Sequence, residues 1–458
     1  MPAFSLEPEQ IAWSAQVRSL AAQRLRPLAE KGEPGRVNRP LVAELGRLGL
    51  LTRLFDSGAL DLCLMRESLA QACTEAETAL ALQGLGAHPV HAHGTPAQRD
   101  RWLPRVIDGT AIAAFALSEP GAGSDAAALA LRADAERDAV ARGGDPAGVS
   151  PAAAAGLGSL ADAGGGDSED GSGDGFGGEG RGGVGGDGRV RRGVRGAGPD
   201  AVLGDAPAAE RDGPRRWRLT GEKCWISNAP EADFYTVFAR TTPGAGARGV
   251  TAFLVPADRP GLTGSALDML SPHPVGALRF DAVPVTADDV LGETDRGFRV
   301  AMGTLNLFRP SVGAFAVGMA QAALDATLHH TRGRDAFGGK LMDLQTVAHQ
   351  VAEMALRTDA ARLMVYAAAT AHDEAAPDVP MRAAMAKLLA TETAQYVVDT
   401  AVQLHGARAL RRGHLLEHLY REVRAPRIYE GASEVQRGII AKELYATYAA
   451  PHTPQEAP

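Results

Sequence analysis

Apolar residues recur at helical spacing through the first hundred positions. The stretches "LVAELGRLGLL" and "LCLMRESLAQAC" place them three and four residues apart in a background rich in Ala, Leu, Arg and Glu, as amphipathic helices require. The pattern predicts an N-terminal all-α domain over residues 1–112. Pro89, Gly94 and Pro96 interrupt it within "HPVHAHGTPAQ", so we expect a loop there, with Thr95 capping a helix that has Pro96 at its first position.

Short β-branched and aromatic runs replace this spacing in the middle of the chain. They are "RWRLTG", "KCWISN", "DFYTVFART", "GVTAFLVP" and "ALRFDAV", each bounded by Gly, Pro, Asn or Asp, which is typical of strands. They predict a middle β domain over residues 113–285. Residues 134–213 contain much Gly, Ala, Asp and Arg and almost no aromatic or branched residues. Such a tract buries too little surface to offset chain entropy, so it predicts a disordered insertion.

Helical spacing returns in the last third of the chain. We expect one helix to begin near Pro310, another to follow "LQTVAHQVAEM", and Pro377 and Pro380 to mark the next boundary. The apolar stripes are Leu344, Val347, Val351 and Met354, then Met385, Leu388 and Leu389. Long helices joined by short loops predict an antiparallel helical bundle over residues 286–447, with a tail at 448–458.

A carboxylate stands just ahead of the last predicted helix, in "RIYEGASEVQR". Pro426 should end the preceding helix, and Ser433 with Gln436 has the spacing of a capping box, so we expect the last helix to start at Ser433. Glu430 and Gly431 then lie beside the N-terminus of that helix. The residues alone leave two interpretations of Glu430, a favourable interaction with the helix dipole or a catalytic role.

Two further motifs have the composition of ligand-binding loops. In "FALSEPGAGSD", residues 115–125, the glycines at 121 and 123 let backbone amides approach a ligand closely, although the stretch could equally be a simple turn. In "EKCWISN", residues 222–228, Trp225 and Ser227 lie on the same side of a predicted strand. A tryptophan there could cover a ligand or belong to the core.

Composition limits the partners. A net charge of -8 from 47 basic and 55 acidic residues argues against nucleic acid or an anionic membrane as a partner of the whole protein. Three cysteines without a CxxC pair suit a reducing cytoplasm. The N-terminus lacks the order of a signal peptide, and no run approaches the roughly 20 apolar residues of a bilayer span. We therefore expect a soluble, cytoplasmic protein without membrane insertion.

Three other features are better explained without a ligand. The GxGxxG match at Gly173, Gly175 and Gly178 follows from a glycine-rich tract with no preceding strand. The basic cluster at residues 189–195 has the composition of a solvated linker. Three histidines at 88, 91 and 93, in the expected loop, fit no tight ligand pattern, so we expect no metal site.

Taken together and in this order, with "RGRDAFGGKLMDLQ" and "VQLHGARAL" between the second motif and the end, the motifs resemble those of the acyl-CoA dehydrogenase family. The resemblance covers nearly everything except the insertion. It implies an α+β fold with an N-terminal helical domain, a middle β-barrel-like domain and a C-terminal antiparallel four-helix bundle. It also implies an FAD-dependent oxidoreductase that takes part in fatty acid β-oxidation.

The resemblance assigns the chemistry to Glu430. The glutamate of the "YEG" motif removes the α-proton of an acyl-CoA thioester, a hydride leaves the β-carbon for flavin N5, and the product is the trans-2-enoyl-CoA. The developing enolate needs donors at the carbonyl oxygen, which the family supplies from the base's own N–H and a flavin ribityl hydroxyl. Glu430 must also be partly desolvated, because burial brings the pKa of a carboxyl nearer to that of a general base. Electrons would pass to an electron-transferring flavoprotein.

The same resemblance implies the contact residues. FAD would be contacted by Phe115, Leu117, Ser118, Gly123, Ser124, Trp225, Ser227, Arg334, Phe337, Gln345, Gln403, Gly406, Ala432, Ser433 and Glu434. The substrate would be contacted by Ser124, Asn306, Arg309 and Gly431. The FAD residues from 334 to 406 match a segment that reaches across a subunit boundary, so the resemblance implies a homo-oligomer, a dimer or a homotetramer.

The chain departs from the family pattern at several positions. Ser227 and Ala432 replace threonines, Ala336 loses a hydroxyl, and Ala407 replaces a glycine. A subgroup places its base where this chain has Phe308, which cannot accept a proton, so Glu430 remains as the base. The segment "FDSGALD" is shorter than usual, which would reshape part of the acyl pocket.

Two alternatives to the dehydrogenase stay open on the sequence. One is an acyl-CoA oxidase that uses oxygen, and the other is a catalytically silent flavin or acyl-CoA binding protein. We also predict that deleting residues 140–210 leaves flavin content and activity largely unchanged.

Overall fold

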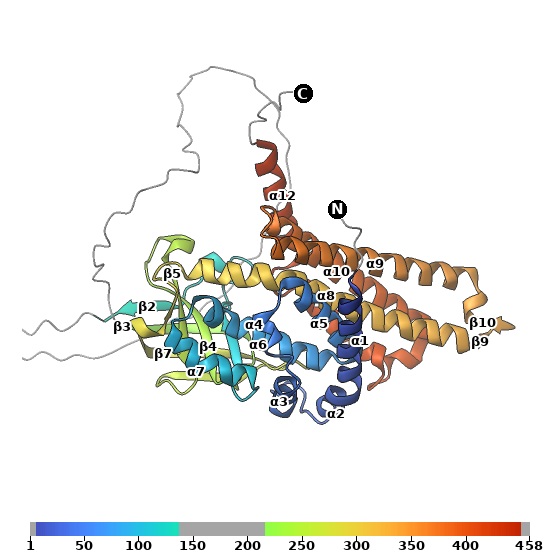
Figure 1. Ribbon diagram of the computed structural model, residues 1–458, viewed down its shortest axis with the longest axis horizontal. Helices are drawn as coiled ribbons and strands as arrows, with labels where there is room; N and C mark the ends of the chain where they lie inside the picture. The colour runs from blue at the N-terminus through green and yellow to red at the C-terminus, as the bar shows by residue number, and fades with distance from the viewer. Residues whose placement is uncertain (1–5, 137–215, 450–458) are drawn as a thin grey trace, which may run out of the picture. The chain divides into compact units, whose positions relative to one another are not determined.

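The computed structural model describes residues 6–136 and 216–449. Helices come first along the chain, then strands, then helices again (Figure 1). The N-terminal helices are α1 (Pro8–Leu20), followed by a π-helical turn (Ala21–Leu25), α2 (Arg26–Ala29), α3 (Arg39–Arg47), α4 (Arg53–Asp56), α5 (Ala59–Ala72), α6 (Thr74–His93) and α7 (Pro96–Ile107). This order confirms the all-α start of the chain.

The loop expected around Pro89 is wrong, because α6 continues through that proline to His93. Pro89 lacks only one donor, and the helix ends four residues later, so the loss is confined to the last turn. His88, His91 and His93 therefore lie on a helix and not in a loop. The prediction for Thr95 is confirmed: its side chain accepts from the N–H of Gln98, whose own side chain accepts from the N–H of Thr95.

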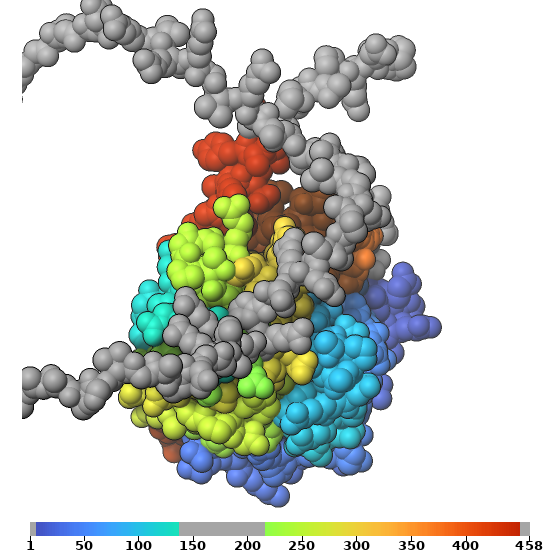
Figure 2. All heavy atoms as spheres, turned by 90° about the vertical axis from the view of Figure 1, so that its left-hand side faces the viewer, coloured from blue at the N-terminus to red at the C-terminus, as the bar shows by residue number. Residues whose placement is uncertain are grey.

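The middle strands form one eight-stranded sheet in the order β6-β7-β3-β2-β4-β5-β8, with β1 paired in parallel to β4. The strands are β1 (Ala113–Ala116), β2 (Arg132–Ala135), β3 (Arg216–Ser227), β4 (Phe234–Arg240), β5 (Val250–Pro256), β6 (Leu262–Ala266), β7 (Val275–Thr286) and β8 (Val290–Leu291). β8 extends the sheet past the expected boundary at residue 285. Figure 2 shows these strands beside the N-terminal helices on one face.

Two details of the strand prediction change. "RWRLTG" and "KCWISN" belong to a single strand, β3, because Gly221 adopts a φ of +139° and carries the chain through a bulge. The start of the insertion is also wrong: Asp134 and Ala135 pair with β3, and the Glu136 N–H donates to the Arg216 carbonyl at 2.9 Å. The remainder of the predicted insertion, with its glycine motif and basic cluster, lies outside the described residues.

The C-terminal helices are α8 (Gly297–Gly333), α9 (Gln345–Asp373), α10 (Val379–His405), α11 (Leu415–Glu422) and α12 (Ser433–Ala449). A hairpin of β9 (Asp335–Ala336) and β10 (Gly339–Lys340) joins α8 to α9. Val347 and Met354 are buried as expected, and Pro380 lies in the first turn of α10. One apolar core joins α8, α9 and α10 to α5, so the N-terminal and C-terminal helices pack directly on each other.

Pro310 does not begin a helix but lies in the middle of α8. Both Pro310 and its neighbour Ser311 are buried, and the Ser311 hydroxyl donates to the Phe308 carbonyl at 2.7 Å, so packing holds the helix where the proline removes a donor. α8 also meets the length and hydropathy of a membrane span, contrary to expectation. In the folded protein 78% of the most apolar stretch of α8 is buried. α8 is therefore placed as a core helix of the fold.

Candidate active site

Glu430 lies in a tight turn between α11 and α12. α11 ends at Glu422, so the helix stops before Pro426, as predicted. Pro426 itself lies in a 3-10 turn, Ala425–Arg427. Glu430 has a φ of 52° and Gly431 a φ of 98°, so two successive residues adopt left-handed backbone, which a glutamate rarely does. A Cβ at position 431 would overlap the side-chain nitrogen of Gln436. Because Gln436 is flexible and could move aside, the φ of 98° is the feature that favours glycine beside Glu430.

The predicted start of α12 at Ser433 is confirmed, but the capping box is wrong. The Ser433 hydroxyl donates to Glu392 on α10 at 2.6 Å. The Gln436 amide donates instead to the carbonyls of Gly431 at 2.9 Å and Glu430 at 3.3 Å. The Ser433 hydroxyl therefore bonds to α10 instead of capping α12. The Gln436 side chain bonds to the 430–431 turn ahead of the helix instead of to Ser433.

The Glu430 carboxyl is desolvated and surrounded by cations. The residue as a whole is part-buried, but its Oε2 atom is buried and has no hydrogen-bond partner among the described residues. Burial raises the pKa of Glu430, and Arg66, Lys387 and Arg309, in that order, oppose the shift. Arg309 donates to the Glu430 carbonyl at 3.2 Å and to Asn306 at 3.2 Å. Two residues predicted to contact substrate thus lie beside the predicted base.

A buried ion pair near Glu430 was not predicted from the sequence. Arg66 on α5 pairs with Glu77 on α6, and its guanidinium also donates to Ser311 on α8 at 2.6 Å. Burial raises the pKa of Glu77. The sequence signal for this ion pair was Arg66 within the apolar run "LCLMRESLAQ". A charged residue on a buried helix face needs a partner of opposite charge.

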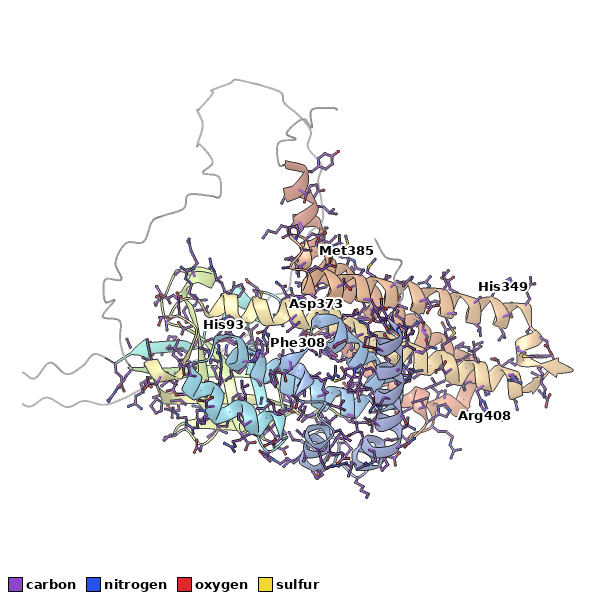
Figure 3. The ribbon with its side chains drawn as sticks, viewed as in Figure 1. His93, Phe308, His349, Asp373, Met385 and Arg408 are labelled. Carbon is purple, nitrogen blue, oxygen red and sulfur yellow. The ribbon has the colours of Figure 1, made fainter. Side chains whose placement is uncertain are left out.

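Phe308, the position of the base in the family subgroup, is packed in the core. Phe308 lies on α8 and is labelled in Figure 3. Its ring packs against Gly84 of α6 and makes an edge contact with His88 at 6.2 Å between centroids. His88 contacts Thr304 at 3.2 Å, and burial lowers the pKa of His88 to about 4. Within the described residues no group of three metal-ligating side chains occurs.

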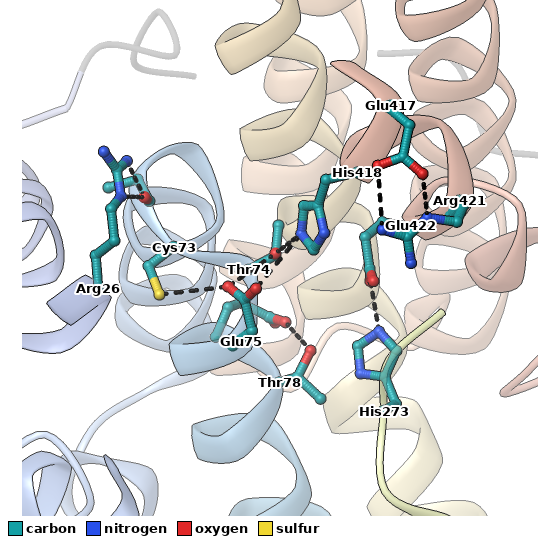
Figure 4. A network of polar contacts seen from close by, with 12 residues as sticks. Arg26, Cys73, Thr74, Glu75, Thr78, His273, Glu417, His418, Arg421 and Glu422 are labelled. Carbon is teal, nitrogen blue, oxygen red and sulfur yellow. Dashed lines mark hydrogen bonds and ion pairs between the residues drawn. The ribbon is translucent and has the colours of Figure 1, made fainter. Parts of the chain in front are cut away.

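α11, which leads into the turn, is anchored from two sides (Figure 4). His418 bonds to Thr74 at the start of α6 at 2.6 Å, and Glu422 bonds to His273 in the β6–β7 connection at 2.5 Å. The Glu422 carboxylate raises the pKa of His273, and His273 in turn lowers the pKa of Glu422. These contacts fix the position from which the chain enters the Glu430 turn.

The loop of the second motif lies against β3. The Leu117 carbonyl accepts from the ammonium of Lys223 at 2.8 Å, and the Ser118 carbonyl accepts from the Cys224 N–H at 3.0 Å. Phe115 packs on Phe238 with 4.9 Å between centroids. These contacts join the motifs at 115–125 and 222–228.

The far part of that loop is open. Gly123 and Ser124 are exposed, and a Cβ built at Gly123 would meet no atom within 4 Å. No neighbour in the described residues therefore requires a glycine there. A backbone without a side chain in open space suits close approach by a ligand.

Trp225 is exposed rather than part of the core. It lies at a bulge of β3 with a φ of 61°, and 55% of the residue is accessible, whereas the next residue, Ile226, is buried. Ser227 is part-buried and pairs with Val275 of β7. A large aromatic ring held outward on strained backbone, next to the open loop, is suited to cover a flat ligand ring.

A second group of predicted FAD residues lies at the other end of α8, by β9 and β10 (Figure 1). α8 begins against β5, and its 37 residues extend roughly 55 Å at 1.5 Å each to the hairpin. Phe337 forms the hairpin turn with a φ of 53° and is 91% exposed. Arg334, Gln345, Gln403 and Gly406 are also exposed at this end, where His330 stacks on His405 at 4.1 Å.

The last three predicted FAD contacts follow Gly431. Ala432 is part-buried and Glu434 is exposed, whereas the hydroxyl of buried Ser433 is taken up by Glu392. Together, an outward indole, an open glycine loop and a carboxylate oxygen that has no partner within residues 6–136 and 216–449 have the chemistry to accommodate a flavin with an acyl thioester. The residues present therefore fit FAD.

The comparisons with known proteins agree along most of the chain. Residues 7–110, 195–283 and 295–445 match the N-terminal, middle and C-terminal domains of acyl-CoA dehydrogenases. The short-chain specific acyl-CoA dehydrogenase of Bos taurus mitochondria is 31% identical over 443 residues, which cover 94% of this chain and 89% of that protein.

Two solved structures have the same fold. Butyryl-CoA dehydrogenase from Megasphaera elsdenii gives a TM-score of 0.75 at 26% identity, over 97% of this chain and 100% of that one. A chain from a structure described as the electron transferring flavoprotein of Acidaminococcus fermentans gives a TM-score of 0.75 at 25% identity, over 96% of this chain and 99% of that one.

The three domain matches follow one another in the order in which the structure places its helices, strands and helices. The expected fold, cofactor and enzyme class are confirmed. The chain belongs to the acyl-CoA dehydrogenase family of FAD-dependent oxidoreductases.

Proposed function

We propose that this protein removes the α-proton of an acyl-CoA thioester with Glu430 and releases the trans-2-enoyl-CoA. The observation that carries the proposal is the buried Glu430 oxygen without a hydrogen-bond partner among the described residues. An ionisable group left unsatisfied in this way costs stability, so it needs a functional reason. Burial also raises the pKa of Glu430, which makes the carboxylate a stronger base for a weak carbon acid.

The backbone of Glu430 is suited to assist the same step. Its carbonyl is held by Arg309 and Gln436, whereas its N–H donates to no oxygen among the described residues. We infer that this N–H donates to the thioester carbonyl as negative charge develops on its oxygen. FAD, when bound, supplies a hydride acceptor for the β-carbon.

Apart from residues 432–434, which follow the base, the proposed FAD contacts divide into two groups. The 115–125 loop with Trp225 and Ser227 would hold the flavin ring near Glu430. Arg334, Phe337, Gln345, Gln403 and Gly406 would hold the pyrophosphate and adenine. The length of α8 between these groups supports a homo-oligomer, a dimer or tetramer, in which a second copy supplies the distal group.

The electron acceptor and setting are also proposals. A fold neighbour described as an electron transferring flavoprotein supports an acceptor of that class. All three cysteines are free, and burial raises the pKa of Cys73 to about 12, as suits inert thiols in a reducing cytoplasm. Fatty acid β-oxidation is the process that an enzyme of this activity would serve.

The test is an anaerobic titration of the purified yellow protein with acyl-CoAs of different chain lengths. Substrate should bleach the flavin of the wild type. Glu430→Gln should still bind acyl-CoA but lower the bleaching rate by about a hundredfold to ten-thousandfold, because glutamine cannot accept the proton. Glu293→Gln, which removes an exposed carboxylate, should behave as the wild type.

Retained turnover in Glu430→Gln would mean that another residue is the base. Rapid reoxidation of the substrate-reduced flavin by air would identify an oxidase instead. A yellow protein that binds acyl-CoA without bleaching would be the catalytically silent alternative.

A further inference from the structure

A lysine lies on the buried face of α10 that is otherwise lined by small side chains. Lys387 is fully buried, and the buried positions around it include Ala383, Ala386, Ala390 and Ala394. Burying an ammonium is costly unless it is partnered. Its Nζ atom donates to the Gly431 carbonyl at 2.7 Å. The partner is thus the residue that follows the proposed base.

α10 holds the Glu430 turn at a second point. Glu392, five residues after Lys387, pairs with Arg427 at 2.9 Å and accepts from Ser433 at 2.6 Å. These partners stand on either side of Glu430 in the chain. α10 therefore holds the turn on both sides of the base. Of the α10 contacts, only that of Lys387 brings a positive charge to the Glu430–Gly431 carbonyls, where Arg309 of α8 also donates.

The ionisable side chains around Glu430 differ in whether their charge changes near neutral pH. Arg66 from α5 and Arg309 from α8 are guanidinium groups that stay protonated. Tyr429 stays neutral, because desolvation raises its pKa well above the usual value. Lys387 from α10 is different, since burial lowers its pKa to about 8.

The charged side chains near Lys387 shift its pKa in both directions. Glu430, Glu392 and Glu434 favour the ammonium, and Arg309 disfavours it. Burial outweighs the carboxylates. The ammonium that binds the Gly431 carbonyl is therefore one whose charge changes near pH 8.

We propose that Lys387 is a positioning residue for Glu430. Its ammonium holds the strained Glu430–Gly431 turn through the Gly431 carbonyl, and its charge keeps the Glu430 carboxyl ionised at lower pH than burial alone would allow. The inference rests on the proposed role of Glu430 as the base.

The experiment compares pH profiles of kcat/KM for flavin-loaded variants. Lys387→Met should move the acidic limb to higher pH by roughly one unit, because an opposite charge lowers a carboxyl pKa by about that much or more. Lys387→Arg should keep the limb near its wild-type position. Gln436→Met removes a neutral donor to the Gly431 carbonyl, which Lys387 also holds, and to the Glu430 carbonyl, so it should lower kcat without moving the limb.

A second readout does not depend on turnover. Infrared difference spectra of the ligand-free protein, with Glu430→Gln as the reference, report the protonation of the Glu430 carboxyl directly, and the same shift should appear there in Lys387→Met. Should that variant fail to bind flavin, Lys387→Gln gives the comparison, since it removes the charge but keeps a donor.

An unmoved acidic limb in Lys387→Met, or an equal shift in Gln436→Met, would overturn the inference. The proposed function fails separately, when the wild type is not bleached by any acyl-CoA or Glu430→Gln remains active. The two failures are therefore distinguishable.

Discussion

At the residue scale, Glu430 combines two unfavourable features that its neighbours sustain. Its backbone is left-handed and its carboxyl is desolvated without a partner among the described residues. Strain of this kind persists only where surrounding contacts over-determine the conformation. Donors on α8, α10 and α12 hold the carbonyls of the turn, whereas Oε2 of the Glu430 side chain receives no hydrogen bond from the described part of the chain.

This arrangement predicts that Glu430→Gln stabilises the protein at alkaline pH. The folded pKa of Glu430 is raised, so ionising the carboxyl is harder in the folded state than in the unfolded state. The resulting penalty is absent below the unfolded value, near pH 4.5, and is complete above the raised folded value. Urea unfolding of the flavin-loaded protein should show Glu430→Gln more stable by about 1 kcal/mol near pH 8.

The two proteins should converge as the pH falls towards about 4, where both side chains are neutral. A Glu430→Gln protein that is less stable than the wild type at alkaline pH would contradict the desolvation argument. Glu293→Gln serves again as the exposed control.

At the element scale, close crossing of α5 and α8 depends on small residues. A Cβ built at Gly318 of α8 would overlap the Glu67 carbonyl and lie 2.7 Å from the Ala70 Cβ atom on α5. At Gly303 of the same helix, a Cβ would meet nothing within 4 Å. Both residues are glycines of α8, but only at Gly318 does the missing side chain allow α5 to approach.

Gly318→Ala should therefore destabilise the protein by about 1–3 kcal/mol, because overpacking forces the two helices apart. Gly303→Ala should be neutral or stabilise by up to about 1 kcal/mol, since alanine favours helix over glycine. Denaturant unfolding of both variants measures the difference. Equal effects would mean that α5 and α8 do not cross closely at Gly318.

At the scale of the whole molecule, the two groups of proposed FAD residues lie at opposite ends of α8. Under the proposed assignment, a complete FAD site would take its distal group from a second copy of the chain. The exposed Phe337 hairpin is the part of the chain that would reach it.

This organisation predicts that two inactive variants restore activity when combined. Glu430→Gln lacks the base, and Phe337→Ser should lose flavin at the distal group. Refolded or co-expressed mixtures contain oligomers with one intact site per mixed pair, so activity should recover to roughly a quarter of the wild type for random pairing in a dimer. The mixed sample is assayed against each variant alone and against an unmixed blend of the folded proteins.

No recovery in the mixture, with both variants shown to associate, would place each FAD site within one chain.

Local patterns predicted much of the fold for physical reasons. Thr95 with Gln98 caps α7, and the strand runs pair as expected, because caps and strand propensity act over a few residues. β1, with the sequence AAFA, and β6, with LTGSA, were missed, since pairing partners and not their own residues make them strands. Pro89 and Pro310 misled for the same reason: packing around a helix tolerates a proline that isolated helices do not.

The sequence by itself determined the order of helices, strands and helices and the start of the last helix at Ser433. These follow from periodicity and from breaker residues. Glu430 became the candidate base only through the resemblance of the contiguous motifs to a known family. Only the tertiary structure decided that Ser433 bonds to Glu392, that Trp225 faces outward, and that Arg66, Arg309 and Lys387 surround Glu430. Those charges come from three helices that are distant in sequence, and the burial that shifts the pKa of Glu430 arises only when they pack together.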